Sequence, residues 1–376
     1  MIKNTPPMGW NSWNTFGADI NEQLIFDTAD KMVETGLKDL GYEYLVIDDC
    51  WSLKERDENG RLKADPEKFP HGMKAVADYV HSKGLKFGMY SCAGNLTCAG
   101  YPGSFEHEFV DAKTFAEWGV DFLKYDYCYH SNIIHGKYLY RRMGLALKNC
   151  GRDILFSACS WGADNTAEWM RETGANMWRS TGDIFDTWES VKSLTEQQDK
   201  ILPYGGAGCF NDMDMLVVGM HGKGNVGLEG LNDTQYKTHF SIWSLFGSPL
   251  MIGCDVRNMT KETLDILSNK ELIKINQDAD CRQVIKVPAI WGGDNLKCYA
   301  RNLENGDIAV GFFNFGDAAA AARLNLDELG LPESTGKTLQ MHEVWSGETV
   351  TVKNGTFIHS INAYDSLVYR CKVVDA

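Results

Sequence analysis

Residues 121 to 130 read Asp-Phe-Leu-Lys-Tyr-Asp-Tyr-Cys-Tyr-His and carry the most information about the fold. An apolar strand is predicted here, and it ends on a single carboxylate, Asp126. Lys124 lies two residues earlier, on the same side of the strand, where it favours the ionised carboxylate. A carboxylate at the carboxyl end of a barrel strand is typical of an active site. The alternative is that Asp126 caps the helix that follows.

Short apolar strands alternate with helical patterns on both sides of this stretch. The predicted strands are residues 8–13, 44–49, 86–92, 122–128, 154–159, 177–181, 202–206 and 250–254. The predicted helices between them are residues 24–40, 73–83, 112–118, 138–148, 187–200 and 234–246. This alternation predicts an α/β protein with a (β/α)8 TIM barrel, and a doubly wound open sheet is the structural alternative.

The pattern changes after Asn276-Gln277-Asp278 to short strands with an apolar period of two. Turn signals such as Ser346-Gly347 and Asn354-Gly355 separate them, which predicts an antiparallel β-sandwich domain. The strands expected here are residues 296–301, 308–314, 340–345 and 366–370. The alanine run 318–322 is the only low-complexity stretch. We therefore divide the chain into a catalytic barrel, residues 1–280, and a β-sandwich domain, residues 281–376.

The composition indicates an enzyme-sized globular protein, with 376 residues of which 44% are hydrophobic. Its formal net charge of −14 is spread along the chain without acidic or basic blocks. This argues against nucleic acid or an anionic membrane as a partner. No stretch approaches the roughly 18 to 20 apolar residues of a membrane span, and no apolar leader precedes the first strand. We therefore expect a cytoplasmic protein, which can form a homo-oligomer.

Polar and aromatic residues follow the predicted strands at their carboxyl ends, where a barrel carries its chemistry. The main groups are Trp10 to Trp13, Asp48 to Trp51, Tyr90 to Cys92, Cys159 to Trp161, and Arg179 with Asp183. Carboxylates beside indole rings suit a sugar, whose hydroxyls need acceptors and whose C–H face packs on an aromatic ring. The glycine-rich loops of a phosphate site are absent. These groups predict a small carbohydrate as the partner and require no cofactor or metal.

Six motifs in the same order closely resemble glycoside hydrolase family 27, the family of α-galactosidases and α-N-acetylgalactosaminidases. They are residues 7–13 (PMGWNSW), 48–51 (DDCW), 94–100 (GNLTCAG), 124–126 (KYD), 179–183 (RSTGD) and 211–216 (NDMDML). The resemblance covers nearly the whole chain, including the C-terminal β-sandwich. It implies a retaining α-galactosidase, with α-N-acetylgalactosaminidase and, less favoured, β-L-arabinopyranosidase as the alternatives.

The resemblance makes Asp126 the catalytic nucleophile and Asp183 the general acid/base. A retaining glycosidase needs one ionised carboxylate that attacks the anomeric carbon and one carboxyl group that exchanges a proton with the leaving oxygen and then with water. We expect Lys124 to keep Asp126 charged and Asp183 to hold its proton longer. Asp186 is the rival for the acid role, but its position favours capping of the helix that contains Trp188.

The resemblance also implies the residues that bind the sugar. Asp48 and Asp49 would accept hydrogen bonds from the 4- and 6-hydroxyls of galactose, and Trp10 would pack under the ring. Tyr90, Lys124 and Arg179 would line the same pocket. Asp212 and Asp214 have either a binding or a structural role.

Specificity at the 2-position is expected from the end of the fifth strand. Cys159-Ser160-Trp161-Gly162 matches the galactosidase pattern, in which Cys and Trp close around the 2-hydroxyl. A shift of one residue would align Ser160 and Ala163 with the N-acetyl pattern instead, so we count Cys159, Ser160 and Trp161 among the substrate-binding candidates.

Two cysteines match a pair that forms a disulfide beside the nucleophile in relatives, namely Cys98 and Cys128. We count both among the residues of the sugar pocket, and in a reducing cytosol the bond can be open or only partly formed. Secreted family members pair the cysteine after the double Asp with one in the loop after the first strand. That loop reads Phe16-Gly17-Ala18-Asp19 here, so Cys50 is expected to be a free thiol.

Two other classes of function would use some of the same residues. A metal-dependent hydrolase could use Asp48, Asp49 and Asp126 as ligands, but it would normally add histidines at the strand ends. A catalytically inactive sugar-binding module is the second alternative, and the presence of both Asp126 and Asp183 argues against it.

Overall fold

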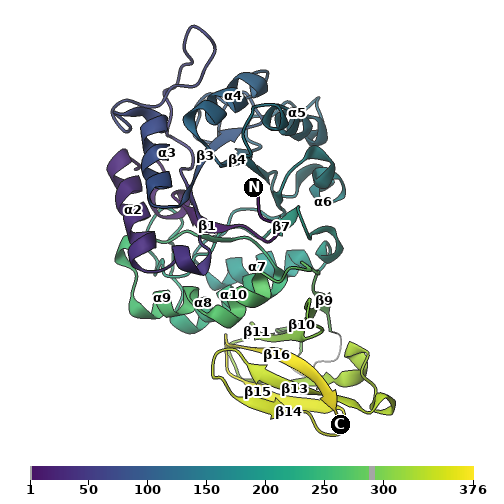
Figure 1. Ribbon diagram of the computed structural model, residues 1–376. Helices are drawn as coiled ribbons and strands as arrows, with labels where there is room; N and C mark the ends of the chain where they lie inside the picture. Colours follow the sequence, from purple (N-terminus) through teal and green to yellow (C-terminus); the bar gives the residue numbers. More distant parts are fainter. Residues whose placement is uncertain (1, 288–292) are drawn as a thin grey trace.

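A computed structural model describes residues 2–287 and 293–376 of the chain. The two domain ranges expected from the sequence include the remaining residues, which lie outside the described part. The first domain forms a ring of helices around a curled sheet, and the second is a separate β-structure below it (Figure 1). Among the described residues, no helix is both long and apolar enough to cross a membrane.

The barrel strands are parallel and pair in the order β7-β6-β5-β4-β3-β2-β1-β8. Their bounds are β1 Met8–Asn11, β2 Tyr44–Val46, β3 Lys86–Cys92, β4 Phe122–Asp126, β5 Leu155–Cys159, β6 Met177–Arg179, β7 Phe210–Asp212 and β8 Leu250–Ile252. A parallel bridge between Leu216 and Ile252 joins the segment after β7 to β8. The sheet therefore closes, and the predicted (β/α)8 barrel is confirmed over the open doubly wound sheet.

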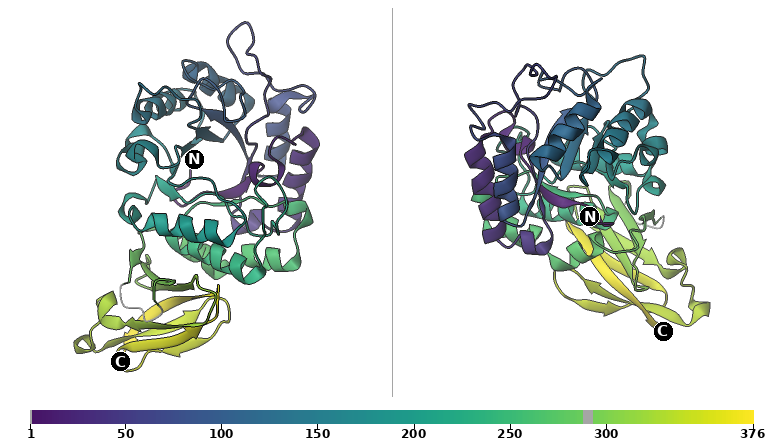
Figure 2. Two further views of the ribbon diagram at one scale, coloured as in Figure 1. Left: turned by 180° about the vertical axis from the view of Figure 1, so that it is seen from behind. Right: turned by 45° about the horizontal axis from the view of Figure 1, so that its top comes forward.

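Helices surround this sheet (Figure 2). They are α1 Trp13–Phe16, α2 Glu22–Glu34, α3 Gly72–Ser82, α4 Glu108–Trp118, α5 Gly136–Lys148, α6 Thr166–Trp169, α7 Trp188–Gln198, α8 Asp233–Phe246, α9 Lys261–Leu267 and α10 Lys270–Asn276. Short 3-10 turns are η1 Lys38–Leu40, η2 Ala163–Asn165, η3 Met170–Thr173, η4 Leu202–Tyr204 and η5 Val256–Asn258. Large apolar side chains are buried between strands and helices, which is the main core of the protein.

The alternation of side chains along β4 explains how the barrel presents its active face. Phe122, Lys124 and Asp126 point to one side of the strand because they are two residues apart. Phe122 is buried in a second apolar cluster with Tyr44, Val46 and other residues of neighbouring barrel strands. Phe122 thus fills the barrel interior, and the same face carries Asp126 at the carboxyl end of the strand.

The seventh strand was predicted at residues 202–206, and this prediction is wrong. That segment is the 3-10 turn η4, with Pro203 in its first turn, and the strand is Phe210–Asp212. Proline lacks the amide hydrogen that a central strand must donate. The correction places Asp212 at the carboxyl end of β7, beside Arg179 of β6.

The C-terminal domain is an antiparallel β-sandwich, as predicted. One sheet has the order β14-β13-β16-β11-β10-β9, and β12 pairs with β15 in the other. The strands are β9 Ile285–Lys286, β10 Leu296–Asn302, β11 Ile308–Asn314, β12 Ala320–Asn325, β13 Lys337–Glu343, β14 Thr349–Thr351, β15 Thr356–Ile361 and β16 Ser366–Asp375, with 3-10 turns η6 Leu326–Leu329 and η7 Glu333–Thr335. Asn354 and Gly355 both have positive φ, of 53° and 64°, as the predicted Asn-Gly turn requires.

The sandwich packs against α8 of the barrel (Figure 1). Trp345 Nε1 donates to Ser241 Oγ at 3.0 Å, and Thr238 Oγ1 donates to the carbonyl oxygen of Tyr364 at 3.0 Å. Trp188 Nε1, at the start of α7, donates to the carbonyl oxygen of Phe315 at 3.1 Å. Because α7 follows the loop that carries Asp183, the second domain anchors one end of that loop.

Candidate active site

A pocket at the carboxyl ends of the barrel strands collects most of the predicted site residues. Nine of them line it: Asp48, Asp49, Tyr90, Cys98, Lys124, Asp126, Trp161, Arg179 and Asp183. Trp13, Asn14, Ile184, Asp214, Met215 and Val226 complete the lining. Trp10, Cys128, Cys159 and Ser160 are the predicted residues that do not belong to this lining.

Asp126 is the last residue of β4 and lies deep in the pocket, with 6% of its surface exposed. Its Oδ1 accepts a hydrogen bond from the amide of Tyr127 at 2.9 Å, and its Oδ2 accepts one from the hydroxyl of Tyr90 at 3.0 Å. Burial raises the pKa of Asp126 above its usual value, although the charge of Lys124 and the amide of Tyr127 act in the opposite direction. These hydrogen bonds fix the carboxyl group in one orientation.

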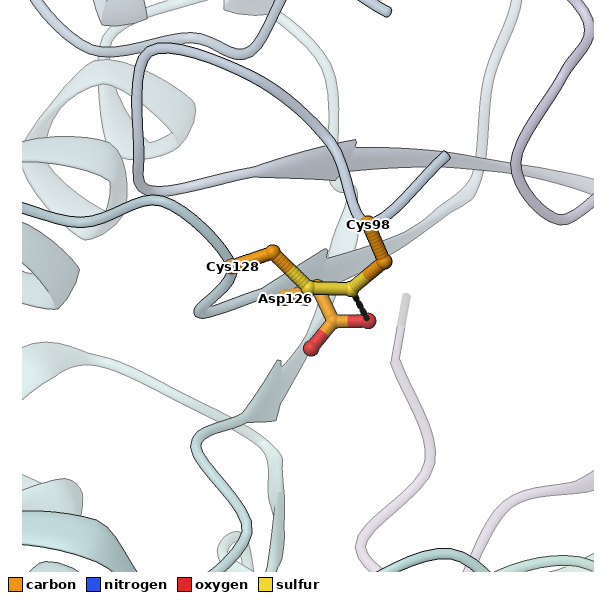
Figure 3. Close-up of side chains that lie close together, drawn as sticks. All are labelled: Cys98, Asp126 and Cys128. Atoms are coloured by element: carbon orange, nitrogen blue, oxygen red, sulfur yellow. Dashed lines mark hydrogen bonds between the residues drawn. A yellow bond between two sulfur atoms is a disulfide. The ribbon is translucent and has the colours of Figure 1, made fainter. Parts of the chain in front are cut away.

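A disulfide joins Cys98 to Cys128, as the family resemblance implied. It lies directly beside the carboxyl group of Asp126 (Figure 3), with Cys98 Sγ 3.5 Å from Asp126 Oδ2. The bond connects the loop after β3 to the loop after β4, so it holds two loops of the pocket together. Cys50 is a free, buried thiol, which confirms the prediction for that residue.

Lys124 pairs with Asp48 and not with Asp126. Its Nζ lies 2.7 Å from Asp48 Oδ2, which also accepts a hydrogen bond from Asn11 Nδ2 at 2.7 Å. The long lysine side chain extends across the pocket and reaches the carboxylate that follows β2. Lys124 lowers the pKa of Asp126 through its charge, as expected, but burial outweighs this effect, so Lys124 does not bring the pKa of Asp126 below its usual value.

Asp48 and Asp49 are buried acceptors, each 2% exposed. Asp49 Oδ1 accepts from the amide of Cys50 at 2.7 Å, and its Oδ2 accepts from the amide of Ala99 at 3.0 Å. Burial raises the pKa of Asp49, although these amides oppose the shift. The pair reaches the pocket as the sequence predicted, with both carboxyl groups held by neighbouring backbone or side chains.

Asp183 lies at the mouth of the pocket, where 64% of its side chain is exposed. Arg179, which is 4% exposed, donates from Nη2 to Asp183 Oδ1 at 2.5 Å and places Nη1 3.0 Å from Asp214 Oδ1. Burial opposes ionisation of Asp183, but the charge and hydrogen bond of Arg179 outweigh it, and the pKa of Asp183 is lowered. The expectation that Asp183 holds its proton longer than Asp126 is thus reversed in the free protein.

Asp214 supports this arrangement from the loop after β7. Its Oδ2 accepts from the amide of Ile184 at 2.7 Å, next to Asp183 in the chain. Burial, together with the charge of Asp214, raises the pKa of the neighbouring Asp212 to about 6. Asp214 has both of the roles expected for it. It lines the pocket, and its ion pair positions Arg179.

Asp186 lies outside the pocket lining and is fully buried. Its oxygens accept from the hydroxyl of Tyr236 at 2.9 Å and from the amide of Gly222 at 2.8 Å. Thr187, and not Asp186, caps α7, because its side chain accepts from the amide of Ser190. Asp186 is a structural residue that ties this loop to the segment before α8.

The end of β5 places Trp161 in the pocket lining, whereas the hydroxyl of Ser160 pairs with that of Thr166 at 2.5 Å. Ser160 is fully buried there. Cys159 is also buried, and its Sγ accepts a weak hydrogen bond from Arg179 Nη1 at 3.6 Å. Trp161 therefore lines the pocket, as the Cys-X-Trp pattern requires, whereas Cys159 and Ser160 do not.

Trp10 is fully buried, and its Nε1 donates to the carbonyl oxygen of Cys254 at 2.9 Å. Trp13, three residues later, lines the pocket instead. Trp13 belongs to the same sequence motif, so the motif contained the signal but did not say which of its tryptophans faces the pocket. Met215 belongs to the motif at residues 211–216, which did not say which of its side chains face the pocket, whereas Ile184 and Val226 carried no signal because they are ordinary apolar residues in loops.

Comparisons with known proteins match both domains. A family model described as alpha galactosidase A matches residues 5–278, and one described as alpha galactosidase C-terminal beta sandwich domain matches residues 293–371. Alpha-galactosidase 3 of Arabidopsis thaliana is 45% identical over 369 residues, which cover 98% of this chain and 82% of the relative. The crystal structure of alpha-galactosidase I from Mortierella vinacea has a TM-score of 0.91 and 35% identity, over 98% of this chain and 96% of that one. The alpha-galactosidase of Saccharomyces cerevisiae solved with raffinose has a TM-score of 0.89 and 30% identity, over 98% of both chains.

Proposed function

The chain belongs to the alpha-galactosidase A family, glycoside hydrolase family 27, and we propose that it is a retaining α-galactosidase in which Asp126 is the nucleophile and Asp183 is the general acid/base. The observation that carries this proposal is the position of these two carboxyl groups in one pocket. Asp126 lies deep, whereas Asp183 lies at the mouth. A sugar bound in the pocket would present its anomeric carbon to the former and its leaving oxygen to the latter.

The reaction takes place in two displacements. In the first, a carboxylate oxygen of Asp126 forms a bond to the anomeric carbon, the bond to the leaving oxygen breaks, and Asp183 gives its proton to that oxygen. In the second, Asp183 takes a proton from water, whose oxygen then displaces Asp126 from the sugar. The exposure of Asp183 suits this role, because both the departing group and the incoming water pass the mouth of the pocket.

Hydroxyl recognition comes from the charged pair Asp48 and Lys124 and from Asp49. All three residues line the pocket, and charged groups of this kind form strong hydrogen bonds with sugar hydroxyls. Trp13 and Trp161 supply apolar surface for the C–H face of the ring. The relative solved with raffinose supports an oligosaccharide with a terminal α-galactosyl group as the substrate class.

Galactose is favoured over N-acetylgalactosamine by the register at the end of β5. Trp161 takes up room in the pocket, and the side chain of Ser160 is turned to Thr166. An acetamido group at the 2-position would have to displace an indole ring, which is costly in a packed site.

The test is hydrolysis of p-nitrophenyl α-galactoside, the α-N-acetylgalactosaminide and the β-L-arabinopyranoside by the purified protein. We expect the highest kcat/KM for the α-galactoside. No turnover of any of the three would refute the enzymatic proposal, and a higher value for either of the other two would reassign the substrate.

We also propose a cytoplasmic location. Nine of the cysteines are free thiols in the structure, and eight of these are buried. Unpaired thiols persist most easily where the surroundings are reducing. Fractionation of cells with an antibody to the protein tests this, and recovery in the medium or an envelope fraction would contradict it.

A further inference from the structure

Three potential metal ligands meet at the disulfide beside the nucleophile. The sulfur atoms of Cys98 and Cys128 and a carboxylate oxygen of Asp126 all lie within 4.8 Å of one another (Figure 3). Ligands of a tetrahedral zinc ion are about 3.4 to 3.8 Å apart, given bonds of about 2.3 Å to sulfur and 2.0 to 2.2 Å to oxygen. The two bonded sulfurs lie closer together than this, and cleavage of their bond would let them separate to the spacing of zinc ligands beside Asp126. While the disulfide is intact, neither sulfur is a thiolate that can bind a metal.

Reducing agents can reach this disulfide more easily than the other cysteines of the pocket region. Cys98 is exposed and Cys128 is half-buried, whereas Cys50, Cys92 and Cys159 are buried. Cys98 and Cys128 lie in the loops that follow β3 and β4. These two strands are neighbours, and their backbones pair as far as Cys92 and Asp126. Reduction would therefore leave both thiols close together, because the sheet still holds the bases of the loops.

The charges around Asp126 also suit a zinc ion with two thiolates. Asp126 carries one negative charge when ionised, and the cations Lys124 and Arg179 act on it. Two thiolates, one carboxylate and one Zn²⁺ have the same net charge of −1. Binding of zinc would therefore not add net positive charge to the surroundings of these cations. The hydroxyl of Tyr90 lies 3.6 Å from Cys98 Sγ and 3.0 Å from Asp126 Oδ2, and water can provide the fourth ligand.

We propose that reduction of the Cys98–Cys128 disulfide creates a zinc site that includes Asp126 and switches the active site off. A thiol reductant supplies two electrons: two R–SH molecules become R–S–S–R, and the disulfide becomes two cysteine thiols. Zn²⁺ then binds both sulfurs and the carboxylate, and the two thiol protons are released to water. The disulfide thus keeps Asp126 available, and its loss makes the site sensitive to metal.

The first experiment measures zinc directly and does not depend on the enzymatic reaction. The oxidised and the dithiol-reduced protein are equilibrated with Zn²⁺, freed of excess metal by gel filtration, and analysed for zinc per chain. We expect about one more bound zinc in the reduced form. Replacement of zinc by Co²⁺ should give a thiolate-to-metal charge-transfer band in the reduced form only. Equal zinc content in both forms would overturn the proposal.

Variants identify the ligands. The additional zinc should be lost in Cys98→Ser, Cys128→Ser and Asp126→Asn and kept in Cys150→Ser, a matched control because Cys150 is a free thiol at the end of α5. Circular dichroism of each variant checks the fold, and the three separate ligand variants mean that one misfolded protein does not decide the result. Zinc that stays bound in both cysteine variants would refute the site.

Activity supplies the functional test, which rests on the proposed function. Zn²⁺ at a concentration that saturates the new site should lower kcat at least tenfold in the reduced wild type, and a chelator should restore it. The oxidised enzyme should keep its activity under the same conditions. If zinc binds to the reduced form as expected but no form of the protein hydrolyses an α-galactoside, the zinc site stands and the proposed function fails. If zinc binds and the reduced enzyme stays fully active, Asp126 is not a ligand.

Discussion

Arg179 donates to Asp183 at 2.5 Å and so stabilises the charged form of the residue that must donate a proton. The same guanidinium lies 3.0 Å from Asp214, which shares its charge. In the free protein the pKa of Asp183 is lowered, whereas burial raises the pKa of Asp126. The two carboxyl groups of the catalytic pair are therefore shifted in opposite directions, each away from the protonation state that its role requires.

This charge arrangement predicts a bell-shaped pH dependence of kcat/KM. As the pH falls, both carboxyl groups become protonated and Asp126 can no longer attack. As the pH rises, the pair loses its only proton and Asp183 can no longer donate. Because Arg179 lowers the pKa of Asp183, Arg179→Gln should raise that pKa and move the limb of the profile that Asp183 controls to higher pH. In Asp214→Asn, Arg179 pairs with Asp183 alone, so the pKa of Asp183 should fall further and the limb that Asp183 controls should move to lower pH.

The measurement is the pH profile of kcat/KM on an aryl α-galactoside for the wild type and the two variants. Each profile is scaled to its own maximum, so that a general loss of activity does not affect the comparison. Shifts of the same sign in both variants would show that Arg179 does not control the protonation of Asp183.

Asp126→Asn should abolish turnover and preserve sugar binding. The change removes the attacking charge with almost no change in volume, and loss of a covalent catalyst usually lowers kcat by several orders of magnitude. Asp39→Asn, an exposed carboxylate in η1, is the control and should leave kcat/KM unchanged. The nucleophile assignment fails if Asp126→Asn retains more than about a hundredth of the wild-type activity.

The stereochemistry of the product tests the two-step mechanism. Retaining glycosidases place their two carboxyl groups about 5 to 5.5 Å apart, too close for a water molecule between nucleophile and sugar. Proton NMR of the reaction mixture should therefore show α-galactose first, before the anomers equilibrate. An initial β-anomer would mean a single displacement by water, and Asp126 would then be a base.

Local sequence patterns predicted the core of the site well. Lys124 and Asp126 are two residues apart on a strand, so they had to share a face, and the pairing of Tyr90 with Lys124 and of Cys92 with Asp126 brings β3 residues to the same place. The family motifs fixed which carboxylates meet. What they did not predict is how the charges pair across the pocket: Lys124 with Asp48, and Arg179 with both Asp183 and Asp214. Such pairing depends on side-chain reach between strands that are distant in sequence.

For the fold, too, local patterns predicted most elements but not those that depend on residues distant in sequence. The apolar period predicted most barrel strands, but the seventh was placed at residues 202–206 because β7, Phe210–Asp212, is very short and has only one apolar residue. In the second domain, the alanine-rich run was seen as low complexity, yet β12 begins at Ala320 and pairs with β15. Alanine has little strand propensity of its own, so β12 depends on its pairing with β15. The sequence of β12 alone does not reveal this pairing.

Exchange of the residues at the end of β5 should change the substrate preference. Trp161 lines the pocket and so limits the space for a 2-substituent, and Cys159 contacts Arg179, which lines the same pocket. The double variant Cys159→Ser, Trp161→Ala should gain kcat/KM on the N-acetylgalactosaminide and lose it on the galactoside, as contacts to the 2-hydroxyl disappear. A change of about tenfold in the ratio corresponds to about 1.4 kcal/mol of differential transition-state binding.

Ser160→Ala is the matched control for this exchange, because the hydroxyl of Ser160 pairs with Thr166 away from the pocket lining. It should leave the ratio of the two kcat/KM values unchanged even if it lowers the stability. A wild-type preference for the N-acetyl sugar, together with a changed ratio in Ser160→Ala, would show that Ser160 faces the bound sugar. In that case the recognition of the 2-position would depend on Ser160 and Ala163, and not on Cys159 and Trp161.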